Sequence, residues 1–159
     1  MPVLTTIRPV VGYLFVDAGL PGPDGEVPLA PPTFYDMLRR RADPAGLLPP
    51  WTSWWDEADV APLFPDPAAR HRIEQEQHRL PLSYFAGSLP VPAGWDGHPG
   101  GYLAFGDTYD ADRRSAVRRG WPARTMPGRH LHTLVDPPGV ATEIDALLTA
   151  IGLGEPHSP

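Results

Sequence analysis

The chain has 159 residues, 42% hydrophobic and 20% charged, which fits one globular domain with a hydrophobic core. Its formal net charge is −6, and its basic residues, all arginines, form only short runs and no clustered basic face, which argues against a nucleic-acid partner. The absence of cysteine excludes disulfides and thiolate chemistry. The sequence shows neither a membrane-length apolar run nor a secretory signal, so we expect a cytoplasmic protein with no membrane partner.

Three apolar segments have the character of buried strands. Residues 10–17 read VVGYLFVD, a run rich in β-branched and aromatic side chains, and residues 101–106 read GYLAFG. Residues 123–126 form a third, shorter candidate. Strands buried on both faces are typical of a parallel sheet that is covered by helices.

Helical spacing, caps and stop signals predict five helices between and after these strands. They are expected at residues 32–41, 67–79, 80–89, 112–119 and 138–151. Thr33 and Asp66 are the predicted N-caps of the first two, and Gly120 is the predicted stop of the fourth. Residues 90–101, rich in proline and glycine, are predicted to form a loop.

The order of these elements predicts an α/β fold with a partial doubly wound parallel sheet of about three strands. We expect one domain over residues 1–154 and a flexible tail over 155–159. Most of the 23 prolines fall within residues 21–99, which we interpret as an irregular, partly helical, cap-like insertion.

Polar side chains follow each predicted strand. Asp17 comes after the first, Asp107 after the second and His130 after the third. Functional groups of open α/β sheets collect outside the carboxyl ends of the strands. An acid and a histidine that meet there can act as a general base, with the carboxylate fixing the imidazole tautomer.

Two stretches of the sequence resemble the α/β-hydrolase family of serine esterases and lipases. They are RPVVGYLFVDAGLP and GYLAFGDTYDADRRSAVRRGWPARTMPGRHLHTLVDPPGVATEI. The resemblance covers roughly residues 9–152 and implies that Asp107 and His130 are the catalytic acid and histidine. It leaves Asp17 as an alternative acid, because some family members take the acid from the earlier strand. His132 is the competing histidine.

The sequence departs from that family at the nucleophile. It contains no G-x-S-x-G elbow, and Ser88, in AGSLP, is the nearest imitation. A complete α/β enzyme runs about 200–250 residues or more. We therefore expect the C-terminal half of a hydrolase, explained by a misassigned start, a truncated gene or a separate N-terminal half that pairs with this chain.

The remaining candidates concern ligands. Trp54, Trp55 and Trp95 are candidates for lining a substrate pocket, with core packing as the alternative. We expect no cofactor and no metal, because His71 and His78 lack a third ligand nearby in the sequence.

Three functions remain open. The first is hydrolysis of a small ester or acyl substrate in a complete enzyme, with this chain inactive alone. The second is a non-catalytic interaction module that forms a homodimer or pairs with another chain. The third is acid–base catalysis by an Asp–His pair without a serine.

Overall fold

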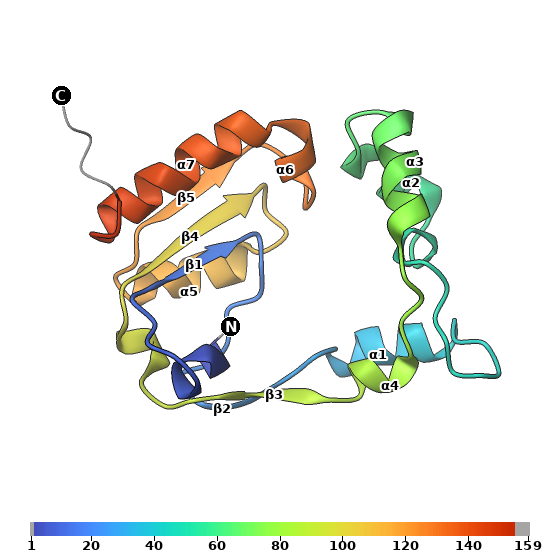
Figure 1. Ribbon diagram of the computed structural model, residues 1–159, viewed down its shortest axis with the longest axis horizontal. Helices are drawn as coiled ribbons and strands as arrows, with labels where there is room; N and C mark the ends of the chain where they lie inside the picture. Colours follow the sequence, from blue (N-terminus) through green and yellow to red (C-terminus); the bar gives the residue numbers. More distant parts are fainter. Residues whose placement is uncertain (1, 155–159) are drawn as a thin grey trace. The chain divides into compact units, whose positions relative to one another are not determined.

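The protein has an α/β fold in a computed structural model that describes residues 2–154 (Figure 1). A three-stranded sheet has the strand order β1–β4–β5 and is parallel throughout, and a second sheet pairs β2 with β3. The tail expected at residues 155–159 lies outside the described residues.

The strands are short and the helices vary from one turn to four. The strands are β1 (Tyr13–Val16), β2 (Gly25–Pro28), β3 (Ser88–Val91), β4 (Gly100–Phe105) and β5 (Ala123–Met126). The α-helices are α1 (Pro32–Arg39), α2 (Glu57–Val60), α3 (Pro67–Glu76), α4 (Leu82–Phe85), α5 (Asp110–Arg118), α6 (His132–Val135) and α7 (Pro137–Ala150). The 3₁₀ turns are η1 (Pro2–Thr6), η2 (Trp51–Ser53), η3 (Ala61–Leu63) and η4 (Trp95–Gly97).

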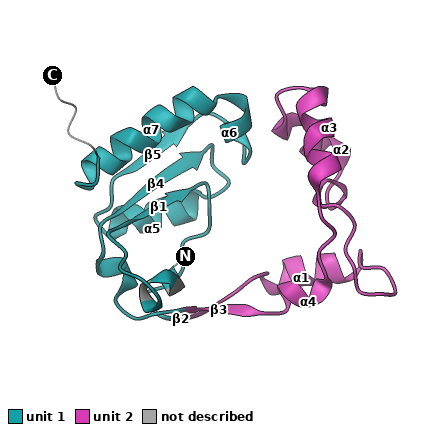
Figure 2. Ribbon diagram, in the orientation of Figure 1, with its two compact units in different colours: residues 1–25, 91–159 teal, residues 26–90 magenta. Residues whose placement is uncertain are grey.

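The chain folds into two compact units (Figure 2). The first, which we call the sheet unit, comprises Met1–Gly25 and Val91–Pro159 and contains the parallel sheet. The second, the insertion unit, comprises Glu26–Pro90. None of the helices in residues 2–154 combines the length and apolar character needed to cross a membrane.

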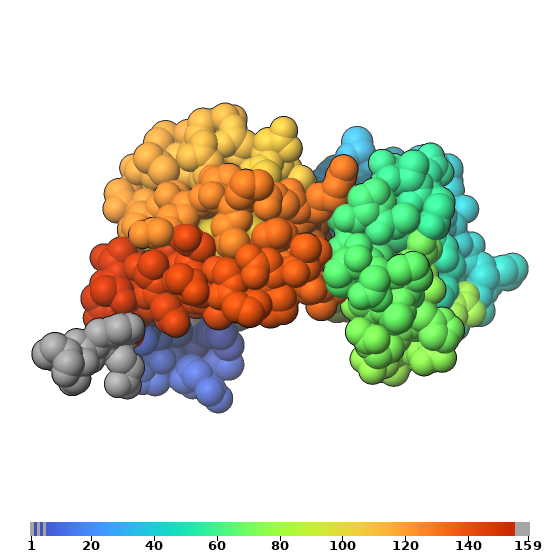
Figure 3. Space-filling view, turned by 90° about the horizontal axis from the view of Figure 1, so that it is seen from above, coloured from blue at the N-terminus to red at the C-terminus, as the bar shows by residue number. Residues whose placement is uncertain are grey.

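One face of the parallel sheet is covered by α7, which Figure 3 shows in orange and red at the surface of the sheet unit. Leu103 and Phe105 of β4 pack against Val140 and Leu147 of α7, and all four are buried. These residues alternate along β4 and recur at helical spacing along α7, as the two periodicities require. Burial of four large apolar side chains supplies the main hydrophobic stabilisation of this face.

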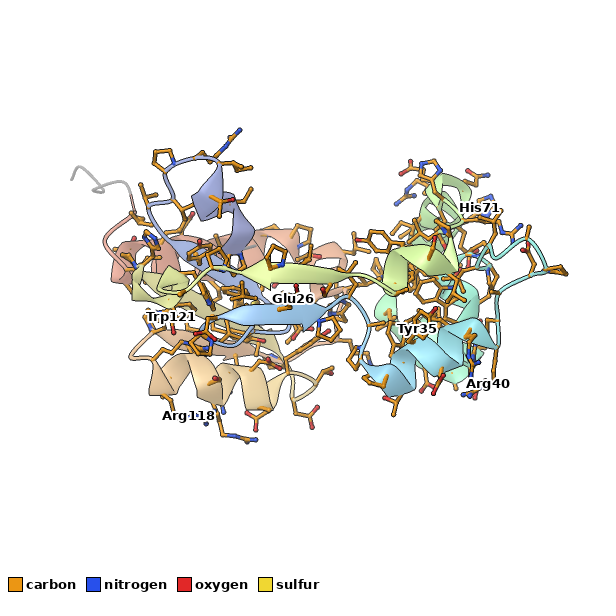
Figure 4. All side chains as sticks on the ribbon, turned by 90° about the horizontal axis from the view of Figure 1, so that it is seen from below. Glu26, Tyr35, Arg40, His71, Arg118 and Trp121 are labelled. Atoms are coloured by element: carbon orange, nitrogen blue, oxygen red, sulfur yellow. The ribbon has the colours of Figure 1, made fainter. Side chains whose placement is uncertain are left out.

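The other face carries an aromatic cluster. The Phe15 ring stacks on Trp121 at 6.0 Å, and Trp95 meets Trp121 edge-on at 5.7 Å. The guanidinium of Arg119 lies over both indoles, 5.6 Å from the ring centroid of Trp95 and 5.9 Å from that of Trp121. Figure 4 shows its neighbour Arg118 pointing away from the strands, as expected on the solvent side of α5.

The insertion unit has its own hydrophobic core of Leu38, Leu48 and Trp54, with Phe34 and Phe85 packed against it. These side chains come from α1, from α4 and from the irregular segment between α1 and α2. Helices too short to be stable alone are thus held by tertiary packing.

Several predicted elements agree with the structure and others need correction. β5 occupies the predicted residues 123–126, and the Asp66 carboxylate caps α3 by accepting the amide of Ala69 at 2.7 Å. Thr33 is not the N-cap, because α1 begins at Pro32 with Pro31 as its N-cap, two residues earlier, and proline is preorganised for the first helical turn. The expected loop over residues 90–101 contains the end of β3, the turn η4 and the first residues of β4. Pro90 lies within β3 and obscured its strand pattern.

Gly100 is required by the aromatic face of the sheet. A methyl group at this position would overlap the indole ring of Trp121, which is itself buried and held by Phe15, Trp95 and Arg119. Gly100→Ala is therefore expected to lower the free energy of unfolding by about 1–3 kcal/mol in urea titration. Gly19→Ala is the control, since a methyl group there meets no atom within 4 Å. Equal stability of the two variants would contradict this account of the packing.

Candidate active site

The carboxyl ends of the three parallel strands lie at one edge of the sheet, where α6 also begins (Figure 1). β1 is followed directly by Asp17, β4 leads into the turn of residues 106–109, and β5 leads into the segment that carries His130. Because all strands run in the same direction, side chains from three separate loops meet at this edge.

Asp17 is buried, with 1% of its surface exposed, and it occupies an unusual position in the β1–β4 ladder. Its amide donates to the carbonyl of Leu103 at 2.7 Å, as the next residue of a parallel strand would. Its side-chain Oδ1 then accepts the amide of Phe105 at 2.8 Å. The register aligns Val16 with Leu103, so this is the amide that the backbone carbonyl of a regular strand residue would bind.

The side chain of Asp17 accepts this amide in place of its carbonyl because of the backbone conformation at Asp17. Its φ is +44°, the one positive value at a non-glycine among the described residues. Left-handed backbone turns the carbonyl out of the ladder, and aspartate is one of the few residues that tolerate it. The carboxylate thus ends β1 without leaving the buried amide of Phe105 unpaired.

The second carboxylate oxygen of Asp17 binds His130. The distance from Oδ2 to Nδ1 of the imidazole is 2.9 Å. An ionised carboxylate can only accept, so Nδ1 carries the proton and the Nε2 atom of a neutral ring carries the lone pair. The His130 side chain is 53% exposed, so a buried acid orients a histidine that solvent can reach.

Two glycines allow the loop after β5 to come this close to β1. Gly106 has φ +69°, and a methyl group on it would lie 2.9 Å from the carbonyl oxygen of Gly128. A methyl group on Gly128 would in turn lie 2.6 Å from the imidazole of His132. The two loops therefore pack backbone against backbone over the end of β4, which brings His130 to Asp17.

His132, the competing histidine in the sequence, has a different environment. Its imidazole meets the ring of Phe105 edge-on at 5.3 Å, and it begins the short helix α6. His132 is therefore part of the packing under the loop, and His130 is the histidine that meets a carboxylate.

The expected pairing of Asp107 with His130 is not found. Asp107 is exposed in the turn after β4, and its backbone carbonyl accepts the amide of Asp110 at 3.0 Å. The residue of this turn that reaches His130 is Tyr109, whose ring centroid lies 5.8 Å from that of the imidazole. The strand pattern does not reveal this, because the turn at Gly106 decides which of the following side chains faces the site.

Long-range hydrogen bonds anchor the segment that follows Asp17. The carbonyl of Ala18 accepts from the Tyr102 hydroxyl at 2.6 Å, and the amide of Leu20 donates to the Asp112 carboxylate at 2.7 Å. The Trp95 indole donates to the carbonyl of Gly22 at 2.8 Å. These bonds hold the left-handed turn at Asp17 from its carboxyl-terminal side.

The pKa values of the two tyrosines near the site are both raised. Burial is the largest cause of the raised pKa of Tyr102, and the negative charge of Asp112 adds to it. Burial also raises the pKa of Tyr109, with further contributions from the charges of Asp17 and Asp112. Both phenols therefore stay protonated well into the alkaline range, in a region whose charged partners are carboxylates.

The tryptophans predicted to line a pocket lie in two different environments. Trp54 and Trp95 are buried, and their indole N–H groups donate to the carbonyls of Pro49 and Gly22 at 2.8 Å each. Both are therefore core residues of their own units, in line with the packing alternative. Trp55 is 44% exposed and stacks on Phe34.

The candidate nucleophile and metal ligands find no support in the described residues. The Ser88 hydroxyl, on β3, donates to the carboxylate of Glu26 at 2.6 Å. Within residues 2–154 no side-chain hydroxyl hydrogen-bonds to His130, and no three histidines or carboxylates are grouped to hold a metal ion.

No protein-family model, curated protein or solved structure matches this chain. The contact between Asp17 and His130 is thus the feature of the chain that points to a function.

Substitution of Asp17 separates its structural role from its effect on His130. Asp17→Ala leaves the amide of Phe105 without its acceptor and should lower the free energy of unfolding by about 1–3 kcal/mol. Asp17→Asn tolerates the left-handed backbone and keeps an acceptor for that amide, so it should be less destabilising. Its amide nitrogen would face Nδ1, however, and should shift the imidazole proton to Nε2.

Urea titration measures the first effect, and nitrogen-15 NMR of the imidazole measures the second. Asp107→Ala is the control and should leave both the midpoint and the tautomer unchanged, because that side chain is exposed. A larger loss of stability for Asp107→Ala than for Asp17→Ala would overturn the assignment.

Proposed function

We propose that Asp17 and His130 are the acid and the histidine of a hydrolytic site that cleaves ester or similar acyl bonds. The observation that carries this proposal is the 2.9 Å contact between a buried carboxylate and Nδ1 of a solvent-accessible imidazole. The Asp17 carboxylate is fixed by the amide of Phe105 before it meets the histidine. Preorganisation of this kind is what a general base in acyl transfer needs.

The chemistry follows from the tautomer. With Nδ1–H bonded to Asp17, the Nε2 lone pair of His130 takes a proton from a hydroxyl nucleophile as it attacks the acyl carbon. The resulting imidazolium forms a charge-assisted hydrogen bond with the carboxylate. The same nitrogen then returns the proton to the leaving alkoxide, and the acyl group stays on the nucleophile as an ester. His130 next takes a proton from a water molecule that attacks this ester and gives it to the nucleophile oxygen, so the acid product leaves and the pair is regenerated.

The resemblance to α/β-hydrolases supports this proposal at the level of arrangement. The acid and the histidine follow two parallel strands of one sheet, and they reach each other across the end of the strand between them. The acid is Asp17, the alternative in the sequence, and not Asp107. The hydroxyl nucleophile is not supplied by the described residues, so we assign it to a complementing segment.

Ester hydrolysis tests both parts of the proposal. The 159-residue chain alone should hydrolyse p-nitrophenyl butyrate no faster than its His130→Ala variant, because the nucleophile is not in place. If the chain alone hydrolysed the ester and His130→Ala abolished that activity, the assignment of the nucleophile to a complementing segment would be wrong.

The longer chain encoded by any in-frame sequence upstream of Met1 should be active if that sequence supplies a G-x-S-x-G elbow. In this chain His130→Ala and Asp17→Asn should each lower kcat by about 10⁴-fold or more. Asp107→Asn is the matched control and should retain activity. Loss of activity with Asp107→Asn but not with Asp17→Asn would contradict the site.

A second candidate function is that of an interaction module. The observation that favours it is the outer edge of β1, which pairs with no strand among residues 2–154. Val11, just before β1, and Ile7, after η1, are 70% and 71% exposed. This N-terminal segment is blue in Figure 3 and lies at the surface of its unit. Open edges and exposed apolar side chains promote association.

Light scattering tests this second function. The chain should form a dimer or larger assembly at micromolar concentration, and Val11→Lys should weaken it by introducing a charge at the edge. Val117→Lys is the control, since Val117 is 52% exposed on α5, away from any strand edge. A monodisperse monomer that unfolds cooperatively would rule the interaction module out.

A further inference from the structure

The imidazole of His130 is held by too few hydrogen bonds to fix its orientation. The bond from Nδ1 to Asp17 is the one hydrogen bond that its side chain makes with the described residues. More than half of the side chain is exposed, and the torsion that turns an imidazole about its bond to Cβ has a broad energy profile. A single bond at one ring atom leaves the ring free to swing, unless a second contact limits it.

Tyr109 supplies that second contact. Its ring lies 5.8 Å from the imidazole with an interplanar angle of 41°, which is within the range of a favourable ring–ring contact. Tyr109 is itself held by its backbone, since it precedes α5 and its carbonyl accepts the amide of Arg113 at 2.9 Å. The contact therefore comes from a fixed part of the chain.

The position of Tyr109 is set by the turn after β4. Gly106 adopts φ +69°, and the carbonyl of Asp107 then accepts the amide of Asp110. This tight turn leaves Asp107 in solvent and carries the half-buried Tyr109 to the imidazole. Each of the three parallel strands thus contributes one side chain to the site: an acid, an aromatic ring and a histidine.

We propose that Tyr109 is a positioning residue, whose ring holds the imidazole of His130 in the plane in which Nδ1 faces Asp17. The ring also shields the Asp17–His130 hydrogen bond from water on the side of the β4 loop. The aromatic face performs this role, and the hydroxyl group does not take part. This inference rests on the proposed function for its catalytic meaning, but it can be tested without catalysis.

Proton NMR of the 159-residue chain provides the test through the Nδ1–H resonance of His130, which a carboxylate partner shifts downfield. Tyr109→Phe keeps the ring and should preserve the resonance and its rate of exchange with water. Tyr109→Ala removes the ring and should raise the exchange rate by about 2- to 10-fold, the factor that corresponds to the loss of one ring–ring contact. Asp107→Ala is the control for disturbance of the turn and should behave as the wild type.

Far-UV circular dichroism establishes whether each variant folds, and Tyr109→Leu replaces Tyr109→Ala if the smaller side chain prevents folding. Unchanged exchange in Tyr109→Ala or Tyr109→Leu would overturn the positioning role and leave the proposed function intact. Faster exchange in Tyr109→Phe would also overturn it, because it would assign the effect to the hydroxyl. Absence of the downfield resonance in the wild-type chain would contradict the Asp17–His130 hydrogen bond itself, and with it the proposed function.

Discussion

The site depends on one hydrogen bond, in which the side chain of Asp17 replaces its own backbone carbonyl as the acceptor in the β1–β4 ladder. With its left-handed backbone but without its carboxylate, residue 17 would leave the amide of Phe105 buried and unpaired, at a cost of about 1–3 kcal/mol. Here the same carboxylate satisfies that amide with one oxygen and orients His130 with the other. Fold and site therefore share one residue, with a different oxygen of its carboxylate serving each role.

β4 is the element that makes this sharing possible. It lies between β1 and β5, and its residues are buried along their whole length. Asp17 and His130 follow its two neighbouring strands and meet across its carboxyl end. This requires a close approach of two loops, which Gly106 and Gly128 allow because they have no side chain. The hydrophobic packing of α7 on one face of the sheet and the aromatic cluster on the other hold β4 in place.

The sequence predicts the fold better than it predicts the site. Runs of buried residues and helix signals locate β1, β4, β5 and α7, because long-range packing and local pattern agree there. They also place Asp17, Asp107 and His130 at one edge of the sheet. They do not choose between the two acids, since that choice depends on a left-handed turn at Asp17 and on the turn at Gly106, which are set by tertiary contacts. Tyr109 was missed for the same reason.

The difference in exposure between the two partners explains why the pair is suited to proton transfer. A buried carboxylate that is already bonded to an amide has little freedom to reorganise, so the field that it applies to His130 is fixed in advance. The imidazole is accessible, so its free nitrogen can meet a group that comes from outside the described residues. The reverse arrangement, a buried histidine beside an exposed acid, would weaken the field through solvent screening and close the base to its substrate. The arrangement of Asp17 and His130 thus favours a base that acts on a hydroxyl delivered to it.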